Sequence, residues 1–339
     1  MTPTPAVLAL AIVLLAPAAR AQTDTVPPLP PPGRLIDLGG WQLHLHCTGA
    51  ARTGQPTVVL EAGAGGFSVD WSLVQPEVAR FARVCAYDRA GSGWSDLGPR
   101  PRTQRQIVWE LHELLSRAGE RAPYVLVGHS LGGTLVRQLA FTYRDEVAGI
   151  VFDESGHERG TKVLRNGQMI RLVDSATNRP VPEPKTSGPL RVADIPPAVR
   201  AQIERAALQM VKQATRTGLP DDANRMRSWS YGQIKHWASN DNPFEGEELA
   251  ALLARWSTTP HALGDMPIVV LSRGRAESAD TVREREHEQD QADLLKLSRR
   301  ARQVIARRAG HGILIDEPEV TIAAIRDVVA ATTRRADAR

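Results

Sequence analysis

The chain has 339 residues, of which 42% are hydrophobic and 24% are charged. This length and composition suit one large α/β domain with an inserted subdomain. The formal net charge of +4 comes mostly from arginines scattered along the chain. Because the sequence has no basic stripe interleaved with aromatic residues, we exclude a nucleic-acid partner.

The N-terminal region predicts export. Residues 6–16 form an apolar run that is short for a membrane span, and residues 19–21 (Ala-Arg-Ala) match a signal-peptidase site. We therefore predict a signal peptide over residues 1–21, followed by a Pro-rich extended linker over residues 22–33. No Lys or Arg precedes the apolar run, so an uncleaved anchor is the alternative. Export implies a periplasmic or secreted protein without stable membrane association after cleavage.

The first half of the chain predicts strands that alternate with helices. Expected are strands at 35–38, 41–47, 57–60 and 83–87, and helices at 71–82 and 103–118. In the second strand, His44 and His46 alternate with leucines, which places both histidines on its polar face. A Gly-rich turn, EAGAGG, follows the third strand, and such a turn lets backbone N–H groups approach a ligand closely.

The segment 123–133, PYVLVGHSLGG, is the most informative stretch of the sequence. A strand pattern over 124–127 stops at the pentapeptide 128–132, which reads Gly-x-Ser-x-Gly, and apolar residues at helical spacing follow it. This arrangement is typical of a nucleophile elbow, in which flanking glycines leave room for a strained serine. We predict that Ser130 is a nucleophile. A passive serine in a Gly-rich turn is the alternative.

A strand is expected at 147–153, and the pattern then changes from residue 159 to residue 262. Strand-like runs vanish there, and helical segments alternate with Pro-rich stretches. We predict a helical lid insertion over 159–262, between two parts of the core at 34–158 and 263–335. Its aromatic residues could offer an apolar surface to a substrate or could only hold the insertion together. These aromatic residues are Trp229, Tyr231, Trp237 and Trp256.

The alternation of strands and helices resumes after the insertion. Strands are expected at 267–271 and 303–306, and helices at 277–297 and 317–332. Such alternation indicates a mostly parallel sheet covered on both faces. His311 lies in a Gly-flanked loop just after the last strand, at the sheet edge where the elbow also lies. A serine hydroxyl needs a base within hydrogen-bond reach, so we predict that His311 is this base.

Four motifs together resemble those of the α/β-hydrolase fold, over residues 33–332. They are LEAGAGG, YDRAGSGWS, VGHSLGG and AGHG. More narrowly, the chain is similar to a group of bacterial alpha/beta hydrolases, often exported, with the LEAG and YDRAG signatures. The resemblance implies a mostly parallel eight-stranded sheet flanked by helices, with a helical lid inserted after strand 6.

The resemblance also assigns roles by position. It implies that Ser130 is the nucleophile, that His311 is the base, and that the backbone N–H groups of Ala64 and Leu131 form the oxyanion hole. The residues alone leave a disulfide and two separate buried cysteines equally open. The strand order of the fold places the strand bearing Cys47 beside the one bearing Cys85, which favours a disulfide in an oxidising compartment.

The acid of the triad is the least defined member. Most of the superfamily places it in a Gly-x-x-Asp turn after the strand at 267–271, where this chain has Glu277 instead, three residues after Gly274. Other members place the acid after strand 6, where Asp153 and Glu154 lie, and Glu154 aligns with an Asp of the similar hydrolases. We rank Glu154 first, then Glu277 and Asp153. Strand-end carboxylates that cap a helix are the alternative for the adjacent pair.

These features predict an exported serine hydrolase that cleaves an ester or related acyl bond of a small molecule through an acyl-enzyme. A serine at the elbow excludes the branch of the fold with an aspartate nucleophile. A C–C bond hydrolase, a small-substrate serine peptidase and a catalytically silent ligand-binding protein are the alternatives. The spacing of Cys and His offers no metal site, and we expect no organic cofactor.

Overall fold

The computed structural model describes residues 29–165, 168–173, 181, 187–239 and 242–336. The predicted signal peptide lies outside the described residues, as does most of the predicted linker. The described end of the linker contacts the body of the protein. The indole of Trp94 donates a hydrogen bond of 2.7 Å to the carbonyl of Leu29, and the N–H of Gly33 donates one of 3.2 Å to His44.

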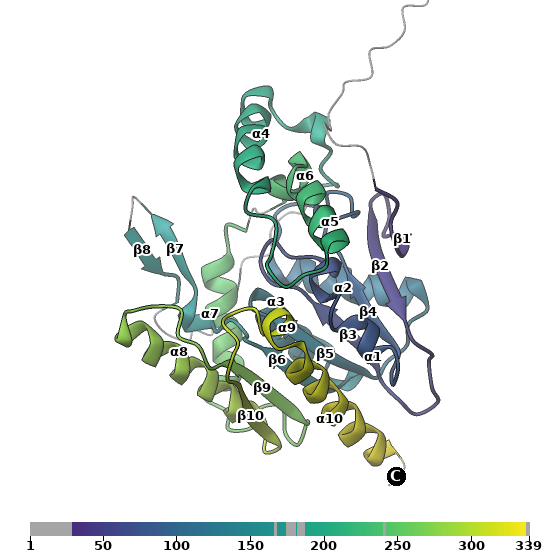
Figure 1. Cartoon of the computed structure of the whole chain (residues 1–339), viewed down its shortest axis with the longest axis vertical. Coiled ribbons are helices and arrows are strands. Elements are labelled where there is room, and N and C mark those ends of the chain that lie inside the picture. The colour runs from purple at the N-terminus through teal and green to yellow at the C-terminus, as the bar shows by residue number, and fades with distance from the viewer. Residues whose placement is uncertain (1–28, 166–167, 174–180, 182–186, 240–241, 337–339) are drawn as a thin grey trace, which may run out of the picture.

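The body is organised around an eight-stranded sheet with the order β1-β2-β4-β3-β5-β6-β9-β10 (Figure 1). Strand β2 is antiparallel to both of its neighbours, and the remaining pairs are parallel, so the predicted sheet is confirmed. The strands are β1 (Arg34–Asp37), β2 (Gln42–Thr48), β3 (Thr57–Glu61), β4 (Val84–Tyr87), β5 (Tyr124–His129), β6 (Val147–Asp153), β9 (Ile268–Arg273) and β10 (Ala301–Ala306).

Helices cover both faces of the sheet, because successive side chains of a strand point to opposite faces. One core contains Val58, Val125 and Val269, with side chains of α1 (Gln75–Val78), α9 (Ile313–Asp316) and α10 (Pro318–Ala336). The core on the opposite face contains Val59 and Leu126, the next residues along β3 and β5, with side chains of α2 (Gln104–Ala118) and α3 (Leu131–Thr142). In the described part of the chain, no helix combines the length and apolar character that a bilayer span requires.

Two helices are shorter than the sequence predicts. Instead of a helix over 71–82, the chain forms a 3₁₀ turn at Ser68–Trp71 and the short helix α1, which starts beside Pro76. Proline has no N–H group and is tolerated only in the first turn of a helix. Helix α8 spans Thr281–Asp293 rather than starting at Glu277, because the Asp280 carboxylate accepts the N–H groups of the helix start and caps it.

The segment between β6 and β9 is not purely helical. It opens with an antiparallel hairpin of β7 (Lys162–Arg165) and β8 (Gln168–Arg171), so the expectation that strands are absent from this segment was wrong. Helices α4 (Pro197–Val211), α5 (Asp221–Tyr231), α6 (Ile234–Ala238) and α7 (Glu245–Ser257) follow. Figure 1 shows α4, α5 and α6 grouped at one end of the molecule, while the hairpin projects on the side of α7 and α8.

The aromatic residues of the insertion pack inward. Trp229 packs against Trp94 of the core with ring centroids 5.3 Å apart, and Trp256 is 3% exposed within the core. Trp237 donates its indole N–H to the carbonyl of Tyr231 at 2.7 Å. None of the four insertion aromatics lines the cavities next to Ser130. They therefore hold the insertion together and against the core, as in the second of the two predicted roles.

Helix α7 of the insertion also caps a core helix. The carboxylate of Glu248 accepts the backbone N–H groups of Gln104 at 2.8 Å and Arg105 at 3.1 Å. These residues begin α2, where N–H groups have no partner within the helix. The side chain of Thr103 accepts a further N–H group, that of Gln106. The insertion and the core are therefore joined by polar bonds as well as by apolar packing.

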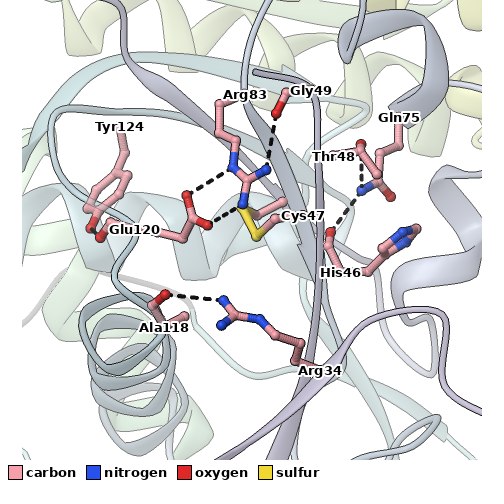
Figure 2. Close-up of a disulfide and its surroundings, with 11 residues drawn as sticks. Arg34, His46, Cys47, Thr48, Gly49, Gln75, Arg83, Ala118, Glu120 and Tyr124 are labelled. Atoms are coloured by element: carbon pink, nitrogen blue, oxygen red, sulfur yellow. Dashed lines mark hydrogen bonds and ion pairs between the residues drawn. A yellow bond between two sulfur atoms is a disulfide. The ribbon is translucent and has the colours of Figure 1, made fainter. Parts of the chain in front are cut away.

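A disulfide joins Cys47 of β2 to Cys85 of β4, which are directly opposite in the antiparallel pair. Figure 2 shows the guanidinium of Arg83 beside it, donating to the Glu120 carboxylate and to the carbonyl of Gly49. Among the described residues, the two cysteines and Glu120 form the one close group of metal-ligand types. Because the sulfurs are bonded to each other and the carboxylate is paired with Arg83, this group is a structural cross-link.

Candidate active site

Ser130 lies at a sharp turn between β5 and α3. Its backbone adopts φ +51° and ψ −120°, in the region that side chains other than glycine rarely adopt. The flanking glycines are required by space. A Cβ on Gly128 would lie 2.5 Å from the carbonyl of Gly132, and one on Gly132 would lie 2.3 Å from the carbonyl of Glu61. The turn therefore has the geometry of a nucleophile elbow.

Two predicted backbone donors flank the serine. Leu131 is the first residue of α3, where a backbone N–H has no partner within the helix. Ala64 lies in the turn that follows β3, the strand next to β5. Both residues line the same cavity as Ser130, so their N–H groups can serve an oxygen atom bound beside the serine hydroxyl.

The turn that contains Ala64 is held in place by a buried ion pair between Arg89 and Glu61, which the sequence analysis did not predict. The guanidinium of Arg89 bonds the Glu61 carboxylate and donates to the carbonyls of Ala62, at 2.7 Å, and Gly63. The hydroxyl of Tyr87 donates to the same carboxylate at 2.5 Å. Burial raises the pKa of Glu61, although Arg89 and Tyr87 oppose the effect. The LEAG and YDRAG motifs thus meet in space, and their co-occurrence was the available signal.

His44 is buried, so its predicted place on a polar strand face was wrong. Its Nδ1 lies 3.0 Å from the Asp88 carboxylate, which also accepts the N–H groups of Ser68 at 2.9 Å and Trp94 at 3.0 Å. Burial acts to raise the pKa of Asp88, but His44 and the N–H donors outweigh it, and the pKa lies below its ordinary value. Both faces of β2 are covered here, because the loop after β4 packs over the face that carries His44.

The loop that carries His311 is held by its backbone. The backbone N–H of His311 donates to the Glu277 carboxylate at 2.6 Å, and the backbone N–H of Gly310 donates to the Asp316 carboxylate at 2.9 Å. The carbonyl oxygen of His311 lies 2.9 Å from Nε2 of His129, the residue just before Ser130. Burial lowers the pKa of His129 to about 3. His129 is therefore neutral and donates an N–H that ties the elbow to the histidine loop.

Glu154 faces the imidazole of His311 from the end of β6. Its backbone has φ +46° and its side chain is almost fully buried. The Nδ1 of His311 lies 3.8 Å and the Nε2 of His287 lies 2.9 Å from Glu154 Oε1. Arg273 donates its backbone N–H at 2.8 Å and its guanidinium at 2.6 Å to the same carboxylate. Burial acts to raise the pKa of Glu154, but these donors outweigh it, and the pKa lies well below its usual range.

The structure places the other two candidate acids in contact with groups other than the imidazole of His311. The carboxylate of Asp153 accepts the hydroxyl of Thr321 on α10 at 2.6 Å, and its second oxygen has no partner among the described residues. Burial raises the pKa of Asp153 to about 7. Glu277 bonds the backbone of His311 rather than its ring. Of the three carboxylates, Glu154 is the one that lines the cavity with Ser130 and His311.

The cavity at Ser130 has a volume of about 390 Å³, and both polar and apolar residues line it. His157 is buried, its Nδ1 accepts the N–H of Arg159, and its Nε2 has no partner in the part of the chain that the structure describes. Burial raises the pKa of Asp290 to about 6, and Gln291 donates to the carbonyl of Ser155 at 2.8 Å. Of the two roles left open for the insertion aromatics, a substrate surface is not seen at this cavity, because none of the four lines it.

Comparisons with known proteins agree with this fold. A family model described as the alpha/beta hydrolase family matches residues 58–324. An AB hydrolase superfamily protein of Gibberella zeae is 27% identical over 315 residues, which are 85% of this chain and 91% of that protein. The chain matches only 18% of the length of a Hormonema carpetanum protein named "Probable transporter efuK", with 33% identity over 129 residues, 37% of this chain.

Solved structures extend the comparison to the whole body. A hydrolase from Pseudomonas aeruginosa PA01 is 20% identical and superimposes with a TM-score of 0.55 over 88% of this chain and 98% of that one. At this level of identity, the likeness establishes a shared fold.

Proposed function

The chain belongs to the alpha/beta hydrolase family, and on that basis we propose that it is a serine hydrolase that cleaves a carboxylic ester or related acyl bond. One observation carries the proposal. Ser130, in a strained turn, lines a single cavity with His311 and with the buried carboxylate of Glu154. A nucleophile, a base and an orienting acid in one cavity are the parts that acyl transfer requires.

The proposed reaction gives each of these groups one task. Ser130 Oγ attacks the carbonyl carbon while the imidazole of His311 takes the hydroxyl proton. The backbone N–H groups of Ala64 and Leu131 bind the oxygen that becomes negative. Collapse of this intermediate expels the alcohol, which receives the proton from His311. Water then attacks the acyl-enzyme by the same path, releases the acid and restores Ser130.

Glu154 acts on the imidazole throughout. Its negative charge fixes the ring with Nδ1 facing the carboxylate and stabilises the imidazolium that forms when the serine proton is taken. The separation of 3.8 Å between Nδ1 and Oε1 is long for a hydrogen bond. Catalytic contacts often shorten when substrate binds, so we expect this distance to fall in the Michaelis complex.

The test is the hydrolysis of p-nitrophenyl butyrate by purified protein and by two alanine variants. Ser130→Ala should abolish turnover and labelling by a fluorophosphonate probe, because only an activated serine reacts with such a probe. Ser116→Ala, at an exposed position on α2, is the matched control and should behave as wild type. Wild-type protein that resists the probe, or unchanged turnover in a folded Ser130→Ala variant, would refute the proposal.

We also propose that the protein works in the periplasm or outside the cell. The disulfide between Cys47 and Cys85 supports this location, because such bonds persist in oxidising compartments. N-terminal sequencing of protein from the periplasm and medium of an expressing bacterium should find a chain that begins at Gln22. Recovery of the chain only in the cytoplasm, starting at Met1, would contradict export.

A further inference from the structure

A second cavity, of about 250 Å³, adjoins the one at Ser130. The two cavities share Ala64, Leu131 and Glu245, so they meet at the two backbone donors. Ser130 and His311 line only the first of them. The second cavity lies between the start of α2 and helix α6 of the insertion, because Gln104 and His236 both line it.

The direction of the reaction assigns these cavities to the two halves of a substrate. His311 must return its proton to the leaving group, so the leaving group departs on the side that His311 lines. The carbonyl oxygen is bound between Ala64 and Leu131. The acyl substituent then extends from the carbonyl carbon away from His311, past these donors and into the second cavity.

The second cavity contains buried polar atoms that lack a partner. Gln104 is 3% exposed, and within the described part of the chain neither its amide nitrogen nor its amide oxygen has a hydrogen-bond partner. Its position is fixed, because its backbone N–H is bound to Glu248 at 2.8 Å. Buried polar groups are nearly always hydrogen-bonded, so an amide left free in a cavity wall is available to bind a ligand.

His236, on helix α6 of the insertion, contributes a second polar side chain to the wall of this cavity. It is 2% exposed, and its Nδ1 lies 3.1 Å from the hydroxyl of Ser230. That hydroxyl accepts the N–H of Gly93 at 3.0 Å, and we assign its own proton to the contact with Nδ1, which places the hydrogen of the neutral ring on Nε2. Burial lowers the pKa of His236 to about 3, which keeps the ring neutral. Nε2 has no partner among the described residues and is a free donor.

The charged residues of this wall do not suit an anion. Arg89 is paired with Glu61, and Arg102 is paired with Glu110 through two bonds of 2.6 Å. Both guanidinium charges are therefore already balanced. Burial, assisted by the charge of Glu248, raises the pKa of Glu245, which shows that this part of the cavity disfavours negative charge.

We propose that the second cavity binds the acyl part of the substrate and selects acyl groups that end in an uncharged hydrogen-bonding group, a carboxamide in the best case. The amide of Gln104 pairs with the substrate amide, donating to its oxygen and accepting from its nitrogen. His236 donates a further hydrogen bond from Nε2. This inference rests on the proposed acyl transfer at Ser130 and names the class of acyl group.

The test compares three p-nitrophenyl esters whose acyl chains have equal numbers of heavy atoms. They are the esters of glutaramic acid, 5-methylhexanoic acid and glutaric acid, which end in a carboxamide, an isopropyl group and a carboxylate. Wild-type kcat/KM should be highest for the glutaramate ester. Gln104→Met should lower kcat/KM for that ester by about tenfold or more and leave the 5-methylhexanoate ester unchanged, because the loss is confined to one buried hydrogen-bonding pair.

A control variant and a binding measurement separate this inference from the proposed reaction. Gln138→Met changes a glutamine on α3 whose amide bonds Thr142 at the surface, and it should match wild type on all three esters. Calorimetry on Ser130→Ala should show tighter binding of glutaramate than of 5-methylhexanoate, and adding Gln104→Met should remove the difference.

Each outcome decides one of the two proposals. Selective binding without turnover by the wild-type protein would uphold the acyl cavity and refute the serine hydrolase. Turnover that depends on Ser130 but shows no preference for the carboxamide would refute the acyl cavity alone. Equal losses on the glutaramate and 5-methylhexanoate esters in Gln104→Met would also refute it, because that pattern reflects damage to the fold.

Discussion

Replacement of Glu154 by glutamine examines the proposed acid with a minimal change of shape. The carboxylate is buried and receives two bonds from Arg273, and the imidazoles of His287 and His311 face its Oε1. A glutamine has one oxygen in place of two. Its NH₂ group must then face either the backbone N–H of Arg273 or the cluster of donors around Oε1. In both orientations the negative charge opposite His311 is lost.

The expected loss of kcat is about 10³- to 10⁴-fold, which corresponds to about 4–5.5 kcal/mol of transition-state stabilisation. The expected destabilisation is smaller, about 1–3 kcal/mol for a buried donor left without an acceptor. Arg273 keeps a second partner, because its guanidinium also bonds Glu284 at 2.9 Å. We therefore expect Glu154→Gln to fold and to be nearly inactive.

The assay measures kcat/KM for p-nitrophenyl butyrate, with urea unfolding of each protein to establish that it is folded. Glu277→Gln is the comparison, because the Glu277 carboxylate bonds the backbone N–H of His311 and not the ring. That variant should retain kcat/KM within about tenfold of wild type, since it loses one neutral donor bond to a loop. A Glu154→Gln variant that keeps more than a tenth of the wild-type rate, beside a Glu277→Gln variant that is inactive, would show the assignment to be wrong.

Two further predictions follow from buried groups. Arg89→Lys should lower kcat by about tenfold with little change in KM. A lysine cannot bond Glu61 and the carbonyls of Ala62 and Gly63 at once, so the backbone N–H of Ala64 shifts out of place. A change in KM alone would contradict this. In Asp153→Asn, stability should fall less with rising pH than it does in the wild-type protein. The pKa of Asp153 is raised from 3.8 to about 7, so the folded protein holds a proton that the unfolded chain releases, and stability falls between about pH 4 and pH 7 by at most about 4 kcal/mol. Urea unfolding at pH 5 and pH 8 measures this, and a wild-type protein that loses no more stability than the variant would contradict it.

The sequence predicted those parts of the site that depend on local pattern. Ser130 is defined by a strand, a turn and a helix that are contiguous in the chain, and His311 by a short loop after a strand. The parallel arrangement then places both at one sheet edge, because the parallel strands that precede Ser130 and His311 both end there. The sheet and the family could be predicted for the same reason.

The remaining features depend on contacts between distant segments. Glu61 and Arg89 are separated by 28 positions, and nothing in either local pattern shows that they pair. Asp153 and Glu154 are adjacent, so only the direction of each side chain distinguishes them. Asp153 points to α10, and Glu154, with its positive φ, turns to the cavity. The hairpin of β7 and β8 was missed because its strands are four residues each, too short for a reliable alternation.

The bonds from Glu248 to the start of α2 bear on how the fold could be engineered. Insertions in a fold of this kind are attractive candidates for exchange between relatives, as a way to transfer specificity. In this chain, the exchanged segment would have to carry a carboxylate at the position of Glu248, because α2 otherwise loses the cap on the N–H groups of Gln104 and Arg105. Loss of a helix cap costs about 0.5–2 kcal/mol. A chimera should therefore be designed around the pair of α2 and α7, with both helices taken from the same parent.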